Sequence, residues 1–177
     1  MAVDGIFITT ELEGEVAKRI HAHQLEFDPK MARFLPPHIT LIGSSGAGPL
    51  PPDTPLAAMK SNILPIAEST APITLQFGLP ERFVQRNIVS LRLDPHGPLR
   101  TLHERLKTCG LPFLQSRYPF TPHCTLNLFP TLTTENLKKM LRVREEEPFT
   151  VHTLCVYHTK EPQPAKLLFK AFLTGTP

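Results

Sequence analysis

A five-residue pattern occurs twice in this chain of 177 residues and constrains its fold more than any other feature. Residues 37–41 read Pro-His-Ile-Thr-Leu, and residues 122–126 read Pro-His-Cys-Thr-Leu. The two histidines, His38 and His123, are separated by almost half of the chain. This duplication predicts two similar halves, related by a pseudo-two-fold axis, that each contribute one copy of the pattern.

Strand geometry predicts which side chains of the pattern face a cleft. In an extended strand, side chains two positions apart lie on the same face. His38 and Thr40 would therefore share one face, as would His123 and Thr125, while the residues after each histidine and each threonine turn toward a core. Proline lacks a backbone N–H and is typical of a strand start. Each copy is thus predicted to present one imidazole and one hydroxyl near the beginning of a strand.

The composition is that of a globular protein, with 41% hydrophobic and 20% charged residues. The net charge of +3, without a dense run of Lys and Arg, favours a phosphate-bearing ligand and does not require long nucleic acid. Cys109, Cys124 and Cys155 form no C-x-x-C pair, which favours reduced thiols in the cytoplasm. No signal peptide and no stretch of roughly 20 apolar residues is found. We expect a soluble, cytoplasmic monomer that has no membrane partner.

Local patterns predict an α+β fold in which a few helices alternate with strands in largely antiparallel sheets. Apolar spacing with start and stop signals predicts helices at 11–24, 56–67 and 98–109, and a short helix beginning near Thr133. Pro65 is expected to kink or end its helix. The loop at 43–55 is interpreted as a surface loop, with a lid over the cleft as the alternative. Besides the two histidine segments, strands are predicted at 6–9, 73–77, 87–93, 149–157 and 166–173.

Four interpretations compete for the duplicated pattern. Coincidence is disfavoured because both the pattern and the approach to it recur. A metal site is disfavoured because each copy supplies one imidazole and alternation turns Cys124 inward. A Ser or Cys nucleophile is disfavoured because no G-x-S-x-G sequence occurs. General acid-base catalysis by two histidines remains, since imidazole titrates near neutral pH.

Two histidines on opposite sides of a phosphodiester suit an in-line displacement. One ring would take a proton from the attacking oxygen, and the other would give a proton to the leaving oxygen. The hydroxyls of Thr40 and Thr125 would donate hydrogen bonds to the nonbridging oxygens, where charge is concentrated as the bond breaks. Such a mechanism requires neither a metal nor a cofactor.

With His-Ile-Thr-Leu at 38–41 and His-Cys-Thr-Leu at 123–126, the chain resembles the two-histidine (2H) phosphoesterases of the LigT-like, 2'-5' RNA ligase group. That superfamily is recognised by two H-h-[T/S]-h tetrapeptides, where h is hydrophobic; Cys124 is an unusual but apolar occupant. The Pro-His pairs, residues 120–122 and the total length extend the resemblance. It implies a single bilobal domain over residues 1–177, with two mostly antiparallel sheets around a central groove and helices outside.

The resemblance also implies a reaction. His38 and His123 would be the catalytic residues of a metal-independent phosphodiesterase that opens 2',3'-cyclic phosphates of RNA ends or nucleotides to 2'-phosphates. The sequence does not say which histidine is the acid, although likeness to the family favours His123 as the base. Three alternatives remain: cleavage of 2'-5' oligonucleotides, a 2'-5' RNA ligase-like activity, and nucleotide or RNA binding without turnover.

Other binding residues are predicted from their positions. Arg117 and Tyr118 come just before the second histidine segment and could contact the phosphate or stack on a base. Further candidates for stacking or for steering an RNA end, each with core packing or plain solvation as the alternative, are Phe34, Phe83, Phe120, Arg82 and Arg86.

Overall fold

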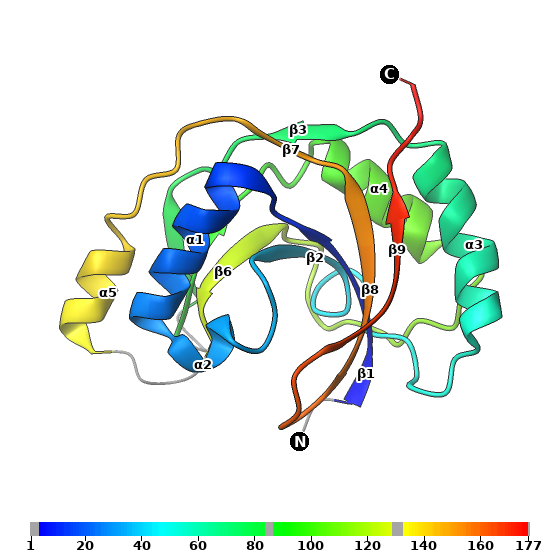
Figure 1. Cartoon of the computed structure of the whole chain (residues 1–177), viewed down its shortest axis with the longest axis horizontal. Coiled ribbons are helices and arrows are strands. Elements are labelled where there is room, and N and C mark those ends of the chain that lie inside the picture. Colours follow the sequence, from blue (N-terminus) through cyan, green and yellow to red (C-terminus); the bar gives the residue numbers. More distant parts are fainter. Residues whose placement is uncertain (1–3, 84–86, 129–132, 177) are drawn as a thin grey trace.

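The computed structural model describes residues 4–83, 87–128 and 133–176, and within these ranges the chain forms five helices and nine strands (Figure 1). None of these helices is long and apolar enough to cross a membrane. The helices are α1 (Gly14–Phe27), α2 (Pro29–Ala32), α3 (Leu56–Glu68), α4 (Pro98–Lys107) and α5 (Thr134–Met140). The strands are β1 (Asp4–Glu11), β2 (His38–Ile42), β3 (Ile73–Leu75), β4 (Pro80–Phe83), β5 (Ile88–Arg92), β6 (His123–Asn127), β7 (Phe149–Val151), β8 (Thr153–Lys160) and β9 (Lys166–Phe172).

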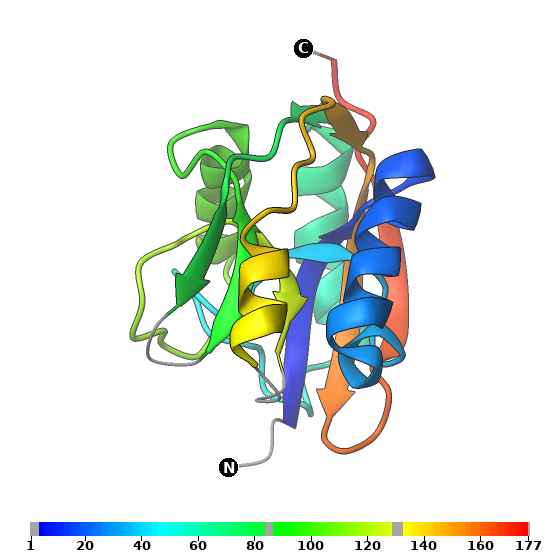
Figure 2. The ribbon, with the colours of Figure 1, turned by 90° about the vertical axis from the view of Figure 1, so that its left-hand side faces the viewer.

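The described strands form two larger antiparallel sheets and one small one. The first has the order β2-β1-β8-β9, the second the order β4-β5-β6, and β3 pairs with β7. In Figure 1, α1, α2 and α5 lie on one side of the strands and α3 and α4 on the other. Figure 2 shows β4 and β5 on the opposite side of the molecule from β8 and β9. Strands β2 and β6 contact each other between the two larger sheets, and the expected α+β fold is confirmed.

The strand pairs that carry the two histidines have the same register. In the β1–β2 pair, Glu11 lies opposite His38, and in the β5–β6 pair, Arg92 lies opposite His123. In both pairs the register shifts by one residue just beyond the motif threonine. Such a shift twists a strand locally and aims its side chains. The duplication in the sequence is therefore also a duplication of sheet geometry.

The core lies behind the two histidine strands. Four residues that alternation turns inward have no exposed surface at all: Ile39, Leu41, Cys124 and Leu126. Helix α4 covers one side of this core and begins with Pro98, whose missing N–H would have no partner in the first helical turn. Beyond the end of α4, Gly110 has a φ of +91°, a conformation that favours glycine. The predicted alternation and the predicted start of α4 are confirmed.

Two predicted elements differ from those observed. Pro65 lies inside α3, which continues to Glu68, so that proline does not end the helix as one expectation held. Ile63 and Ala67, which lie before and after the proline on the same face of the helix, are both buried. Packing against the core therefore holds the helix on both sides of Pro65. The strand predicted at 149–157 is wrong as a single element, because the exposed His152 separates β7 from β8 and the two strands join different sheets.

Two short elements were not predicted. Helix α2 has four residues and follows Asp28, whose carboxylate accepts a hydrogen bond from the Met31 N–H at 3.0 Å. Strand β4 begins at Pro80 and pairs along β5 in antiparallel fashion. Each is too short to produce a periodic pattern, since four residues show barely one helical turn or two strand alternations.

The loop at 43–55 is attached to the rest of the molecule by backbone hydrogen bonds. The Gly46 N–H donates to the carbonyl of Tyr118 at 2.8 Å, and Leu50 exchanges two hydrogen bonds of 2.9 Å with Ile6. Ala47 and Leu50 are buried in the core. These attachments support the interpretation as a docked surface loop over the alternative of a lid.

Candidate active site

The rings of His38 and His123 are held in the same way. Nδ1 of His38 lies 2.8 Å from the carbonyl oxygen of Pro36, and Nδ1 of His123 lies 2.7 Å from that of Thr121. A carbonyl oxygen can only accept, so Nδ1 carries the proton of each neutral ring. The lone pair is then on Nε2. In both halves, Nε2 is therefore the atom that can take up or release a proton.

Burial lowers the pKa of both histidines. For His38, burial is the largest effect; the Pro36 carbonyl and Glu11 oppose it, and the charge of His123 lowers the pKa further. For His123, burial again dominates and the Thr121 carbonyl opposes it. The two rings are thus close enough for one charge to disfavour the other. The pair therefore favours a state in which at most one of the two rings is protonated to imidazolium. An acid and a base that work together need such a state, because one must hold a proton while the other is neutral.

The motif threonines lie on the same face as the histidines. Thr40 and Thr125 are half-buried, whereas the residues between them and the histidines are fully buried. Thr40 lies opposite Thr9 in β1, and Thr125 lies opposite Ser90 in β5. Residues opposite each other in an antiparallel pair share a face. Thr9 and Ser90 are buried, so each half offers the hydroxyl of its motif threonine beside its histidine, and a hydroxyl can donate a hydrogen bond to a phosphate oxygen.

Each motif strand is supported by a polar side chain from a helix of the other half. Gln24 of α1 donates from Nε2 to the carbonyl oxygen of Thr125 in β6 at 2.8 Å. Nδ1 of His103 in α4 donates to the carbonyl oxygen of Leu41 in β2 at 2.7 Å. The ring of His103 also stacks on Phe120, with centroids 4.0 Å apart and planes 9° from parallel. Sequence reasoning missed both helix residues, because nothing local connects them with strands so distant in the sequence.

The three candidate aromatic residues have different surroundings. The Phe83 ring contacts His123 edge to face, with centroids 5.2 Å apart, so β4 brings it to the site. Phe120 is buried against His103 and belongs to the core. Phe34 is half-buried in the segment before β2. Of the three, Phe83 is the one that the structure brings against a motif histidine.

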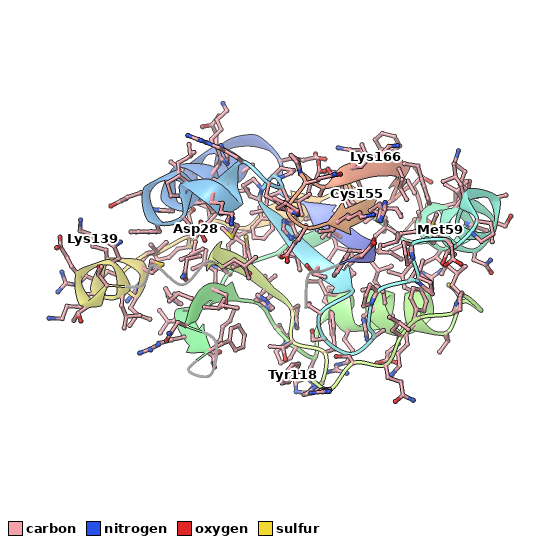
Figure 3. The ribbon with its side chains drawn as sticks, turned by 90° about the horizontal axis from the view of Figure 1, so that it is seen from below. Asp28, Met59, Tyr118, Lys139, Cys155 and Lys166 are labelled. Carbon is pink, nitrogen blue, oxygen red and sulfur yellow. The ribbon has the colours of Figure 1, made fainter. Side chains whose placement is uncertain are left out.

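Two of the predicted binding residues lie at the surface. Arg117 and Tyr118 are exposed in the segment that leads into β6, and Figure 3 shows Tyr118 at the periphery of the molecule. Their role in binding stays a prediction. Nη2 of Arg82 donates to the side chain of Asn87 at 2.5 Å. Arg86 lies outside the described residues.

Acidic residues near the histidines were also missed by sequence reasoning. Glu11 lies opposite His38 in the sheet, and Glu81 of β4 raises the pKa of His123.

The cysteines of the chain are free, and Cys124 and Cys155 are fully buried. In the described part of the chain, no three side chains of the His, Cys, Asp and Glu types are arranged to hold a metal ion.

Comparison with known proteins agrees with this geometry. The profile of the family described as the 2'-5' RNA ligase superfamily matches residues 12–163. No curated protein sequence matches the chain significantly. Among solved structures, TT0787 of Thermus thermophilus is similar over 100% of both chains, with 20% sequence identity and a TM-score of 0.69.

Structures of E. coli LigT are similar as well. LigT complexed with phosphate matches over 98% of this chain and 99% of its own, with 17% identity and a TM-score of 0.62. LigT complexed with 3'-AMP matches over 97% and 98%, with 18% identity and a TM-score of 0.61. At these identities, the likeness establishes the fold. The family match shows that this chain belongs to the 2'-5' RNA ligase superfamily, and the solved structures show that it shares the fold of LigT.

Proposed function

We propose that this protein is a 2',3'-cyclic phosphodiesterase that opens the cyclic phosphate of RNA ends or nucleotides to a 2'-phosphate. The observation that carries the proposal is the matched pair of hydrogen bonds from Nδ1 to a backbone carbonyl, which leaves Nε2 of both His38 and His123 available for proton transfer. Membership in the superfamily supports the same class of reaction.

The proposed reaction adds one water molecule to the substrate. Nε2 of one histidine accepts a proton from water as the water oxygen bonds to phosphorus. The bond between phosphorus and the 3' oxygen breaks, and Nε2–H of the other histidine protonates that oxygen. The product has a 2'-phosphate and a free 3'-hydroxyl. The base ends the cycle protonated and the acid neutral, and proton exchange with solvent restores both.

The motif residues have defined roles in this scheme. Likeness to the family supports His123 as the base and His38 as the acid. The hydroxyls of Thr40 and Thr125 would donate hydrogen bonds to the nonbridging oxygens, which gain charge in the transition state. Phe83, edge to face against His123, is a candidate wall for the nucleoside. We also propose that the protein acts as a monomer and that residues 1–177 form one domain, because the two histidine strands contact each other.

The neighbours in the comparison support a nucleotide substrate. E. coli LigT has been solved with phosphate, with 3'-AMP and with ATP, so this fold accommodates nucleotides and phosphate. The half-buried hydroxyls and imidazoles of this chain are suited to the same kind of ligand. Arg117 and Tyr118 remain candidates for the outer part of the substrate.

A second candidate function is joining RNA through a 2'-5' bond, which the description of the matching family favours. In that reaction a 5' hydroxyl oxygen would replace the water oxygen, bond to phosphorus and expel the 3' oxygen. The same two histidines would exchange the same protons. Cleavage of a 2'-5' linkage would be the reverse.

Incubation of the full chain with a 2',3'-cyclic nucleotide in the presence of EDTA tests the proposal. We expect a 2'-phosphate as the product. A 3'-phosphate product, or a strict need for added metal, would contradict the mechanism. Parallel reactions with a 2'-5' dinucleotide and with RNA halves bearing a cyclic phosphate and a 5' hydroxyl compare the alternatives. Tight nucleotide binding with no cleavage of any substrate would instead indicate a binding protein.

A further inference from the structure

A charged cluster lies next to His38 on the same face of the four-stranded sheet. Glu11 of β1 is directly opposite His38 of β2, an arrangement that places Cβ atoms roughly 5 Å apart. One oxygen of the Glu11 carboxylate accepts a hydrogen bond from the hydroxyl of Tyr157, and the other accepts from Nζ of Lys170 at 2.7 Å. The carboxylate next to His38 is therefore held in place from two strands.

The register of the sheet puts this cluster and the motif residues on one face. Thr9, two residues before Glu11, lies opposite Cys155 of β8, and Cys155 lies opposite Lys170 of β9. Cys155, which is labelled in Figure 3, therefore lies between Thr9 and Lys170 across the sheet. The Glu11 side chain is 13% exposed and that of Lys170 is 36% exposed. Solvent screens the Glu11 charge less than it would screen a charge on the open surface.

The equivalent position in the other half carries the opposite charge. Arg92 lies opposite His123 just as Glu11 lies opposite His38, and Arg92 pairs with Glu81 at 3.4 Å. The two half-sites share their register, their Nδ1 hydrogen bonds and their threonines. They differ in the residue beside the histidine.

We propose that Glu11, fixed by Tyr157 and Lys170, is a positioning residue that controls how readily the His38 imidazole holds a proton. Its consequence for turnover rests on the proposed function, because only there does His38 transfer a proton. Glu11 is not itself placed to touch the reacting atoms, since its oxygens are occupied by Tyr157 and Lys170.

The charges around His38 make the direction of the effect definite. Burial raises the pKa of Glu11, but the hydrogen bonds from Lys170 and Tyr157 outweigh it and lower that pKa overall, so the carboxylate stays charged at neutral pH. A nearby anion favours imidazolium and a nearby cation opposes it. Among the described residues, the titratable groups that act on Glu11 and His38 are His123 of β6, Cys155 and Tyr157 of β8, and Lys170 of β9, with Glu13 acting on Lys170.

Neither Tyr157 nor Cys155 ionises near neutral pH. Burial raises the pKa of Tyr157, and it raises the pKa of Cys155 to about 11. Besides His123, the charges of this cluster near neutral pH are therefore those of Glu11 and Lys170, which have opposite signs. Removing one of these two charges leaves the other uncompensated, so the two removals must move His38 in opposite directions.

The test follows the titration of both histidine rings by NMR in the full chain, without substrate. We expect Glu11→Gln to lower the pKa of His38 and Lys170→Met to raise it, each by roughly half a pH unit or more, with a smaller change at His123. Asp4→Asn is the matched control, because Asp4 is another paired carboxylate of β1, beside His158 and Lys160. It should leave His38 unmoved.

Activity provides a second readout. The limb of the pH–rate profile that belongs to His38 should shift in the same two directions, and Glu11→Asp should restore the wild-type profile in part. The proposal is overturned if both substitutions leave the His38 titration unmoved or move it the same way. A chain that fails to cleave cyclic phosphates would contradict the proposed function. The NMR titration needs no turnover, so it would still test the effect of Glu11 on His38. Lys170 is partly exposed, so its variant remains informative if Glu11→Gln fails to fold.

Discussion

Gln24 and Thr125 are joined by a hydrogen bond of 2.8 Å that crosses from α1 to the carbonyl oxygen of β6. Helix α1 follows β1 in the chain, so a helix of the first half supports the histidine strand of the second half. His103 of α4 supports β2 in the reciprocal way. The two half-sites are therefore held by each other's helices, and damage to one helix should be felt at the opposite histidine.

Replacing Gln24 should destabilise the protein and disturb the second motif. In Gln24→Met the side chain keeps its volume but leaves the Thr125 carbonyl without its donor. We expect the free energy of unfolding, measured in urea, to fall by about 1–2 kcal/mol, with a severalfold loss of kcat/KM. Leu25→Met, one position along the same helix and largely exposed, is the control. Equal stability of the two variants would contradict the bracing role.

The motif threonines should matter for rate rather than for folding. Thr40→Val and Thr125→Val remove a hydroxyl while keeping the branched shape, and each should lower kcat by about 100-fold if the hydroxyl stabilises transition-state charge. Thr74→Val is a control, because Thr74 bonds Thr150 in the small β3–β7 pair. A change in kcat of less than about threefold at both motif positions would remove the threonines from the mechanism.

Stability should decline on the acid side of neutrality. Burial lowers the pKa of His38, His103 and His123 below the ordinary value. At a pH between the folded and the unfolded pKa of such a histidine, the unfolded state binds more protons than the folded state. The contribution of the neutral, buried histidines to the free energy of unfolding is therefore complete above about pH 6.5. It is lost as the pH falls through the folded pKa values. Urea unfolding between about pH 8 and pH 5 should show the decline.

One variant separates the titration of His103 from that of the two motif histidines. His103→Gln keeps a donor for the Leu41 carbonyl but cannot titrate, so its stability should depend less steeply on pH, by up to about 1.4 kcal/mol per pH unit. The pH–rate profile should change little, because His103 is buried away from the reacting face. If the free energy of unfolding of His103→Gln changed with pH as steeply as that of the wild type, His103 would not contribute to the pH dependence of stability.

The cysteine within the second motif should be chemically inert in the folded protein. Burial raises the pKa of Cys124 to about 12 and that of Cys155 to about 11, and neither has exposed surface. Cys109 is half-buried just beyond the end of α4. Iodoacetamide should therefore label Cys109 slowly, with activity retained, and all three cysteines only in denaturant. Native-state labelling of Cys124, detected by mass spectrometry, would contradict the inward orientation.

Much of the site is predictable from sequence because strand alternation is a local property. His38 and Thr40 share a face in any regular strand, and the repeat at 122–126 indicates the partner half. The start of α4 at Pro98 is equally local. These features need only a few neighbouring residues to specify them.

The rest depends on contacts that no local pattern encodes. Glu11 meets Lys170 only after the chain has returned through β8 and β9, and Gln24 meets Thr125 across the two halves. The break at His152 follows from β7 and β8 joining different sheets, although residues 149–157 consist largely of strand-forming residues. Tertiary pairing decided these points, and propensity could not.

In the proposed mechanism, His38 and His123 work as one unit on a cyclic phosphate. Initial rates on a 2',3'-cyclic nucleotide in EDTA for His38→Gln, His123→Gln and the double variant test this cooperation. We predict that each single substitution lowers kcat by about 100- to 10,000-fold and that the double variant loses little more. Near wild-type turnover by either single variant, or losses that simply multiply in the double variant, would contradict the account.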